Sequence, residues 1–301
     1  MHESNTTVDF NSLSKIDSIN TLAVQYSQLC DELANALLGP VKFHFEYDLS
    51  GRIIKLEKFI NNDTSTLINY YFTYNSFGDV VKIISQTHEI AVEASDSTIF
   101  SYPSTGITEA STYVIDYGTT IYTIYKFRFQ DTKDSTSILV TQDDGYGAFP
   151  LKFKAVLNKN TNGDISVATY FRNEPNYGNS YTDTSTVIKN EYYTALNNPF
   201  YSIYQRLPFP LFFLLRYGGL SVASDIIDLA QFGSKHCISN ISQYVYSKPL
   251  CVPTSQIFLD QYTFPSAIYQ FSGSNITSIV SNRFFPTLTG NVNINTTITY
   301  K

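Results

Sequence analysis

The chain has 301 residues, of which 43% are hydrophobic and only 15% are charged, and a chain this apolar is not intrinsically disordered. Its formal net charge is −6 and no run of five basic residues occurs, which argues against nucleic acid as a partner. The 24 Tyr and 22 Phe residues, together with abundant Thr, Ile and Val, are typical of β-strands.

The first 40 residues are predicted to form a polar arm followed by one helix. Residues 2–12 are polar. The apolar positions after them recur every three or four residues, and they are Ile16, Ile19, Leu22, Tyr26, Leu29, Leu33 and Leu37. This spacing predicts a helix from about residue 12 to residue 38, ended by Gly39-Pro40.

From residue 41 the apolar period changes to two, and a hairpin phrase is repeated. The phrase "FHFEYDLSGRIIKL" at 43–56 is followed by "YYFTYNSFGDVVKI" at 70–83. In both, alternating aromatic residues lead to a turn that begins with Asp or Asn and ends with Gly. A weaker third copy lies at 153–167, with the turn Asn160-Thr161-Asn162-Gly163, and further turns are predicted around 131–134, 144–145 and 273.

Consecutive hairpins predict a mainly β fold. We expect residues 41–301 to form a single antiparallel β domain, as a curved meander or a partly closed barrel. The N-terminal helix and short helices at about 199–233 are expected to cover or plug it. Within that region the apolar segment 207–217 is the candidate plug, and the predicted ligand-contacting residues are Phe209, Phe212, Phe213 and Tyr217.

The hairpin sequence Tyr47-Asp48-x-x-Gly51 resembles the YD repeats of Rhs-type proteins. A wider resemblance spans about residues 41–301 and includes "NPF" at 198–200 and Ser239-Asn240. It is to a secreted-lipoprotein family of unknown function, found in Gram-negative envelopes and described as having a porin-like β fold. The resemblance implies export to the periplasm or the outer-membrane surface, and a lipid anchor on a Cys upstream of residue 1. It implies no activity.

The sequence contains no recognisable catalytic motif and no metal-ligand spacing, so no catalytic residue, metal site or cofactor is predicted. His44 lies on the strand face opposite Phe43 and Phe45, as a solvated residue would. The three cysteines, Cys30, Cys237 and Cys251, are expected to be unlinked thiols, with a Cys237–Cys251 bridge as the alternative.

The leading hypothesis is therefore an exported, non-enzymatic binding or scaffold protein of the cell envelope. We expect it to be monomeric, to bind a lipid or glycan, and to meet the membrane only through a lipid anchor. One alternative is a glycan-active hydrolase that uses the paired carboxylates Asp143 and Asp144. The other is an integral outer-membrane β-barrel. Charged residues in the middle of predicted strands, such as Lys126 and Arg128, argue against this alternative.

Overall fold

The computed structural model describes residues 13–24, 41–60, 63–89, 92–116, 120–142, 151–171, 184–207, 233–247, 258–264, 267–285 and 290–301. This part of the chain forms 17 strands and one short helix, and it includes no helix long and apolar enough to cross a membrane. The strands are β1 (Ile16–Val24), β2 (Val41–Tyr47), β3 (Ile53–Ile60), β4 (Asp63–Tyr74), β5 (Val80–Glu89), β6 (Val92–Ser104), β7 (Ile107–Asp116), β8 (Thr120–Asp131), β9 (Ser135–Gln142), β10 (Leu151–Lys159), β11 (Ile165–Phe171), β12 (Thr184–Asn197), β13 (His236–Ser247), β14 (Phe258–Phe264), β15 (Ile268–Ser272), β16 (Asn275–Phe285) and β17 (Gly290–Tyr300). The helix α1 (Tyr201–Tyr204) lies between β12 and β13.

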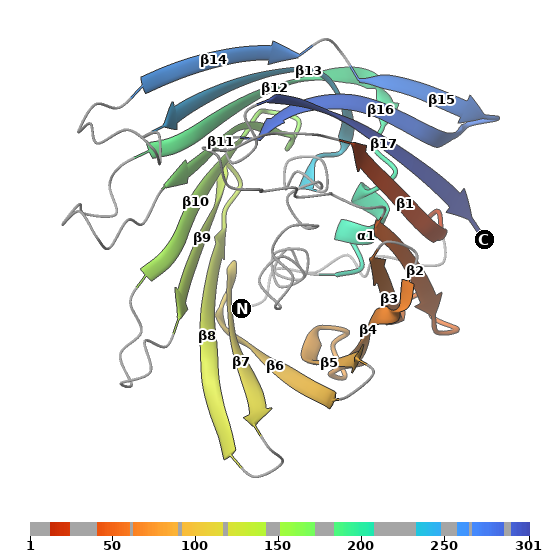
Figure 1. Cartoon of the computed structure of the whole chain (residues 1–301), viewed down its shortest axis with the longest axis vertical. Helices are drawn as coiled ribbons and strands as arrows, with labels where there is room; N and C mark the ends of the chain where they lie inside the picture. The colour runs from red at the N-terminus through yellow and green to blue at the C-terminus, as the bar shows by residue number, and fades with distance from the viewer. Residues whose placement is uncertain are drawn as a thin grey trace, which may run out of the picture.

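The strands belong to one antiparallel sheet that curves around an interior (Figure 1). Each strand from β2 to β13 pairs with the strand that follows it, as expected for consecutive hairpins. β1 lies between β17 and β2 and joins the two ends of the meander. β14 pairs with β13 and β15 pairs with β16, whereas no register pairing joins β14 to β15 among the described residues. The predicted curved meander or partly closed barrel is confirmed.

The sheet has an apolar concave face. Phe45, Leu56 and Tyr70 are directly paired across β2, β3 and β4, and all three are buried. In the neighbouring row, Glu46 pairs with Lys55 and neither is buried. Because side chains alternate between the two faces of a strand, one face collects the apolar row and the other the charged row. Helix α1 contributes to the same buried cluster and lies inside the curved sheet (Figure 1), so the apolar face is the inner one.

The three predicted copies of the hairpin phrase are confirmed as β2–β3, β4–β5 and β10–β11. In their turns, 48–51, 75–78 and 160–163, the side-chain oxygen of the first residue accepts the backbone N–H two residues later. The glycine that closes each turn has a φ of 79°, 89° or 85°. This left-handed conformation favours glycine, so the repeated Asp/Asn-x-x-Gly pattern specifies these turns locally.

The predicted N-terminal helix is wrong over residues 16–24, which form β1. Ile16 and Ile19 are both buried although they are three residues apart, a spacing that suggested a helix. The pairing register of β1 with β17 shifts between Ile16 and Ser18, and this irregularity lets both isoleucines point to the inner face of the sheet. β1 thus belongs to the same sheet as β2 and β17. Residues 13–15 are described and are not helical, and residues 25–38 of the predicted helix lie outside the described residues.

A repeated hydrogen bond ties neighbouring strands at the end of the sheet where the short turns lie. In each instance a tyrosine hydroxyl donates to a main-chain carbonyl near the start of a strand that lies next to its own strand or next but one. The donors and acceptors, at 2.5–2.9 Å, are Tyr47 and Ile16, Tyr74 and Ile53, Tyr102 and Val80, Tyr192 and Ile165, Tyr269 and Ile238, and Tyr300 and Ile276. We call these bonds the tyrosine clasps. Part of the tyrosine excess therefore serves to fasten strands together at the turn end.

Candidate functional site

The chain between β12 and β13 enters the curved sheet at the turn end, and its two described ends are held together. The Asn198 amide N–H donates to the carbonyl of Lys235, and the Asn198 side-chain amide donates to the carbonyl of Ser234, both at 2.8 Å. The Asn198 side-chain oxygen accepts the N–H of Phe200 at 3.1 Å, which fixes the entry to α1. Asn198 is buried, so all of these bonds are shielded from water.

Residues 198–207, which we call the floor segment, pack their apolar side chains into the inner cluster. Phe200, Ile203 and Leu207 are each no more than 2% exposed and belong to the core formed by the concave face. Of the region 199–233 that was predicted to hold short helices, residues 199–207 and 233 are described, and they include the one-turn helix α1; of the candidate plug 207–217, Leu207 alone is described. The floor segment therefore contributes to the buried interior of the curved sheet, and the contacts predicted for the plug beyond Leu207 stay a prediction.

Arg206 connects the floor segment to strands far away in the sequence. Its side chain is buried and donates to the carbonyl of Gly51 at 2.9 Å and to those of Leu13 and Ser14 at 3.0 Å. The guanidinium also lies 5.2 Å from the ring centroid of Tyr47, within cation–π range. Burial lowers the pKa of Arg206. One side chain therefore joins the floor segment to the β2–β3 turn and to the residues before β1.

A histidine and a buried aspartate lie where the chain between β12 and β13 joins β13. The carboxylate of Asp164 accepts the backbone N–H of His236 at 3.0 Å and pairs with its Nδ1 at 2.8 Å. Ser234 is also buried, and its hydroxyl accepts the N–H of Ile165 at 2.9 Å and lies 2.8 Å from the hydroxyl of Tyr192. Ser, His and Asp are the residue types of many hydrolase active sites. The Ser234 hydroxyl, however, is buried and hydrogen-bonded to the N–H of Ile165 and to Tyr192. The group braces the β10–β11 turn against the start of β13.

Cys237 follows this group and is a buried free thiol. Its sulfur donates to the carbonyl of Asn197 at 3.3 Å, and burial raises its pKa to about 12. The alternative of a Cys237–Cys251 bridge is therefore wrong.

The predicted ligand-contacting residues Phe209, Phe212, Phe213 and Tyr217 lie outside the described residues, as do Asp143 and Asp144 of the hydrolase alternative. Both assignments stay predictions. His44 lies on the outer face, as expected from its alternation with Phe43 and Phe45, which are buried. Sequence reasoning missed Arg206 and Asp164, because no local pattern distinguishes them from the other charged residues near turns.

Comparison with solved structures finds several neighbours of low similarity, three of which follow. A porin-like protein of Bacteroides uniformis is 11% identical, covers 95% of this chain and 96% of its own, and has a TM-score of 0.32. A porin-like protein of Bacteroides vulgatus is 13% identical, with coverages of 96% and 99% and a TM-score of 0.34. A protein of unknown function from Bacteroides fragilis is 17% identical, covers 36% of this chain and 81% of its own, and has a TM-score of 0.33.

No family model matches the chain, and no curated protein matches it either. The neighbours carry porin-like or unknown-function descriptions, but at these scores they decide neither the fold nor the function. The fold described above rests on the structure of this chain.

Proposed function

We propose that the protein is an exported, non-enzymatic binding or scaffold protein of the cell envelope, which holds an apolar molecule against its concave face. The observation that carries this proposal is the apolar inner face above the floor segment. A lipid or an aromatic glycoside is the class of ligand that fits such a surface.

The size of the sheet supports a ligand. Barrels of about eight strands fill their interior with their own side chains, and larger ones need other material inside. Here 17 strands curve around the interior, and at the turn end the floor segment supplies Phe200, Ile203 and Leu207 as filling. Beyond the floor segment we propose that Phe209, Phe212, Phe213 and Tyr217 contact the ligand.

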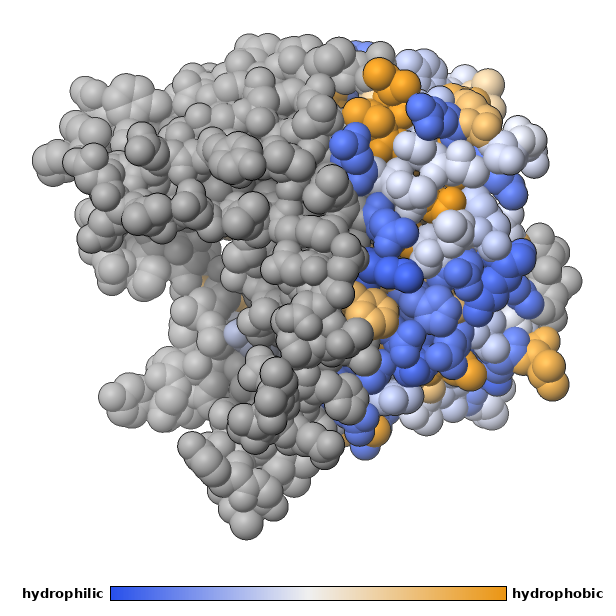
Figure 2. Space-filling view, turned by 45° about the vertical axis from the view of Figure 1, so that its right-hand side comes forward, coloured by the Kyte–Doolittle hydropathy of each residue, from blue (hydrophilic) through white to orange (hydrophobic). Residues whose placement is uncertain are grey.

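The outer face supports contact with water over the part of the chain that the structure describes. Figure 2 shows a surface that is mainly hydrophilic there, with scattered apolar residues. Lys126 and Arg128 are exposed in the middle of β8, and the guanidinium of Arg128 lies 3.7 Å from the carboxylate of Glu109 on β7. A lysine or arginine on the lipid face of a membrane barrel costs about 2–4 kcal/mol at mid-depth, so these positions favour the binding protein over the integral-membrane alternative.

The envelope location and the upstream lipid anchor rest on the resemblance of residues 41–301 to the secreted-lipoprotein family. They are tested by fractionating cells that express the complete gene and by labelling with radioactive palmitate. Recovery of the unlabelled protein in the cytoplasm would contradict this part of the proposal.

Ligand binding is tested without detergent, using the fluorescent apolar probe N-phenyl-1-naphthylamine and displacement by lysophospholipid or alkyl glucoside. We expect saturable binding that Phe212→Ala weakens. Phe77→Ala is the matched control, because Phe77 is 89% exposed in a turn and should not affect binding. The absence of saturable binding, or steady turnover of glycosides, esters or peptides by the pure protein, would contradict the proposal.

A further inference from the structure

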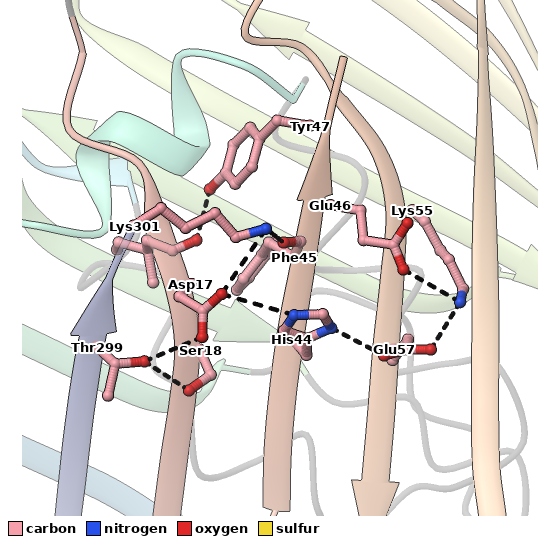
Figure 3. A network of polar contacts seen from close by, with 11 residues as sticks. Asp17, Ser18, His44, Phe45, Glu46, Tyr47, Lys55, Glu57, Thr299 and Lys301 are labelled. Atoms are coloured by element: carbon pink, nitrogen blue, oxygen red, sulfur yellow. Dashed lines mark hydrogen bonds and ion pairs between the residues drawn. The ribbon is translucent and has the colours of Figure 1, made fainter. Parts of the chain in front are cut away.

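A network of charged side chains lies on the outer face of β2 and β3 (Figure 3). His44 Nδ1 is 2.8 Å from a carboxylate oxygen of Glu57, and the Lys55 ammonium is 2.6 Å from the other oxygen of that carboxylate. The same ammonium is 3.3 Å from Glu46, and His44 Nε2 is 3.6 Å from Asp17 on β1. Two carboxylates thus contact one ammonium group, and the imidazole of His44 links one of them to Asp17.

The sheet register brings these side chains together from separate strands. His44 pairs directly with Glu57, and Glu46 pairs directly with Lys55, across the β2–β3 ladder. Directly opposed residues project from the same face with their Cβ atoms about 5 Å apart. The residues are therefore close because of strand pairing, and their positions 44, 46 and 57 form no recognisable metal motif in the sequence.

The ligand atoms have the spacing that a small cation needs. One nitrogen of His44 and one oxygen each of Glu46 and Glu57 all lie within 4.8 Å of one another. With metal–ligand bonds of about 2.0–2.2 Å, a tetrahedral zinc ion separates its ligand atoms by about 3.4 Å. The His44–Glu57 contact of 2.8 Å would open by about half an ångström, and Glu46, whose side chain is 42% exposed, has room to approach.

A buried oxygen on the next strand provides an independent indication. Asn69 on β4 pairs directly with Glu57, so its side chain projects from the same face. Asn69 is only 5% exposed, yet its Oδ1 has no hydrogen-bond partner. Buried polar groups are nearly always satisfied, and an unsatisfied oxygen on the residue paired with Glu57 is accounted for if a cation binds between the two side chains.

We propose that this cluster is a binding site for a divalent transition metal ion, with Zn²⁺ as the representative. His44 Nδ1 and the carboxylates of Glu46 and Glu57 are the ligands, and Asn69 Oδ1 completes the set. The ion takes the place of the Lys55 ammonium, whose side chain can turn towards the ring of Tyr71, 5.9 Å from its present position. Imidazole and carboxylate ligands suit zinc and its neighbours in the first transition row. The site joins three strands on the face opposite the proposed ligand, so it does not depend on the proposed function.

The test is calorimetric titration of the full chain with ZnCl₂, together with Co²⁺ absorption spectra as a report on ligand geometry. We expect one high-affinity site, which His44→Gln weakens at least about tenfold. Lys55→Gln should tighten binding, because it removes the competing cation and leaves both carboxylates. His236→Gln is the matched control, because His236 is also paired with a carboxylate at 2.8 Å and should leave the affinity unchanged.

Two results would overturn the proposal. One is a failure of both the wild type and Lys55→Gln to bind an equivalent of Zn²⁺. The other is equal Zn²⁺ affinity in the wild type and His44→Gln, which would place the bound metal elsewhere on the chain. Circular dichroism of each variant checks that the fold is intact, which we expect for His44→Gln and Lys55→Gln because both lie on the outer face; the same check is required of His236→Gln, because His236 pairs with buried Asp164.

Discussion

Replacing Arg206 by methionine should detach the floor segment from the opposite side of the sheet. Methionine keeps much of the length and apolar stem of arginine but removes every donor. The carbonyls of Leu13, Ser14 and Gly51 then lose the guanidinium that they share. These residues lie about 150 to 190 positions away in sequence, so the substitution breaks long-range contacts.

The expected loss of stability follows from those contacts. A hydrogen bond to a charged group contributes about 1.5–3 kcal/mol, so three such bonds amount to roughly 5–9 kcal/mol. Removing a buried charge also relieves a desolvation cost of several kcal/mol, which offsets part of the loss. We therefore expect Arg206→Met to lower the free energy of unfolding by about 2–4 kcal/mol.

The assay is equilibrium unfolding in urea, followed by far-UV circular dichroism and by tyrosine fluorescence, since the chain has no Trp. The matched control is Arg52→Met. Arg52 pairs with Asp48 at 2.7 Å, but its side chain is 32% exposed, so the loss should be below about 1 kcal/mol. Equal stabilities of the two variants would refute the conclusion that Arg206 fastens the floor segment.

Three further predictions concern tyrosine and lysine side chains. Tyr74→Phe should lower stability by about 0.5–1.5 kcal/mol in urea unfolding through loss of its clasp, whereas Tyr71→Phe, at a 38% exposed position, should change it little. Burial raises the pKa of Tyr47 and Tyr300 to about 12. The stability that these two side chains contribute is therefore complete below about pH 10 and is lost as the pH rises towards 12. A free energy of unfolding that stays constant over this pH range would contradict the prediction. Burial lowers the pKa of Lys58 to about 8, so the native state binds fewer protons than the unfolded state between about pH 8 and 10.4. Urea unfolding at several pH values should therefore show that the stability of the wild type rises over this range, and that the stability of Lys58→Met rises less.

The hairpins were predictable because their turns are encoded locally. Asp48 to Gly51 contains both the side chain that caps the turn and the glycine that adopts its left-handed conformation. The alternation of Phe43 and Phe45 with His44 likewise assigned the buried and exposed faces of β2. A mainly β meander follows from these features without knowledge of which strands meet.

The strand β1 shows how local reasoning failed. The spacing of Ile16 and Ile19 fits both a helix and a strand with a register irregularity. Residues 16–24 form a strand because its pairing with β17 and β2 gives hydrogen-bond partners to the backbone N–H and C=O groups of all three strands. The partner β17 begins at Gly290, far outside any local window.

The sequence by itself therefore determined the turns, the apolar faces and the antiparallel hairpins, since each depends on residues within about a dozen positions of one another. Only the tertiary structure decided that Arg206 reaches Gly51, that Asp164 holds His236, and that Asn69 lies opposite Glu57. These contacts arise from sheet curvature, from the path of the floor segment and from strand register. Charged residues carry no periodic signal that would reveal such partners. Most of them lie on the surface at no fixed spacing, so the sequence does not distinguish those that pair with distant residues.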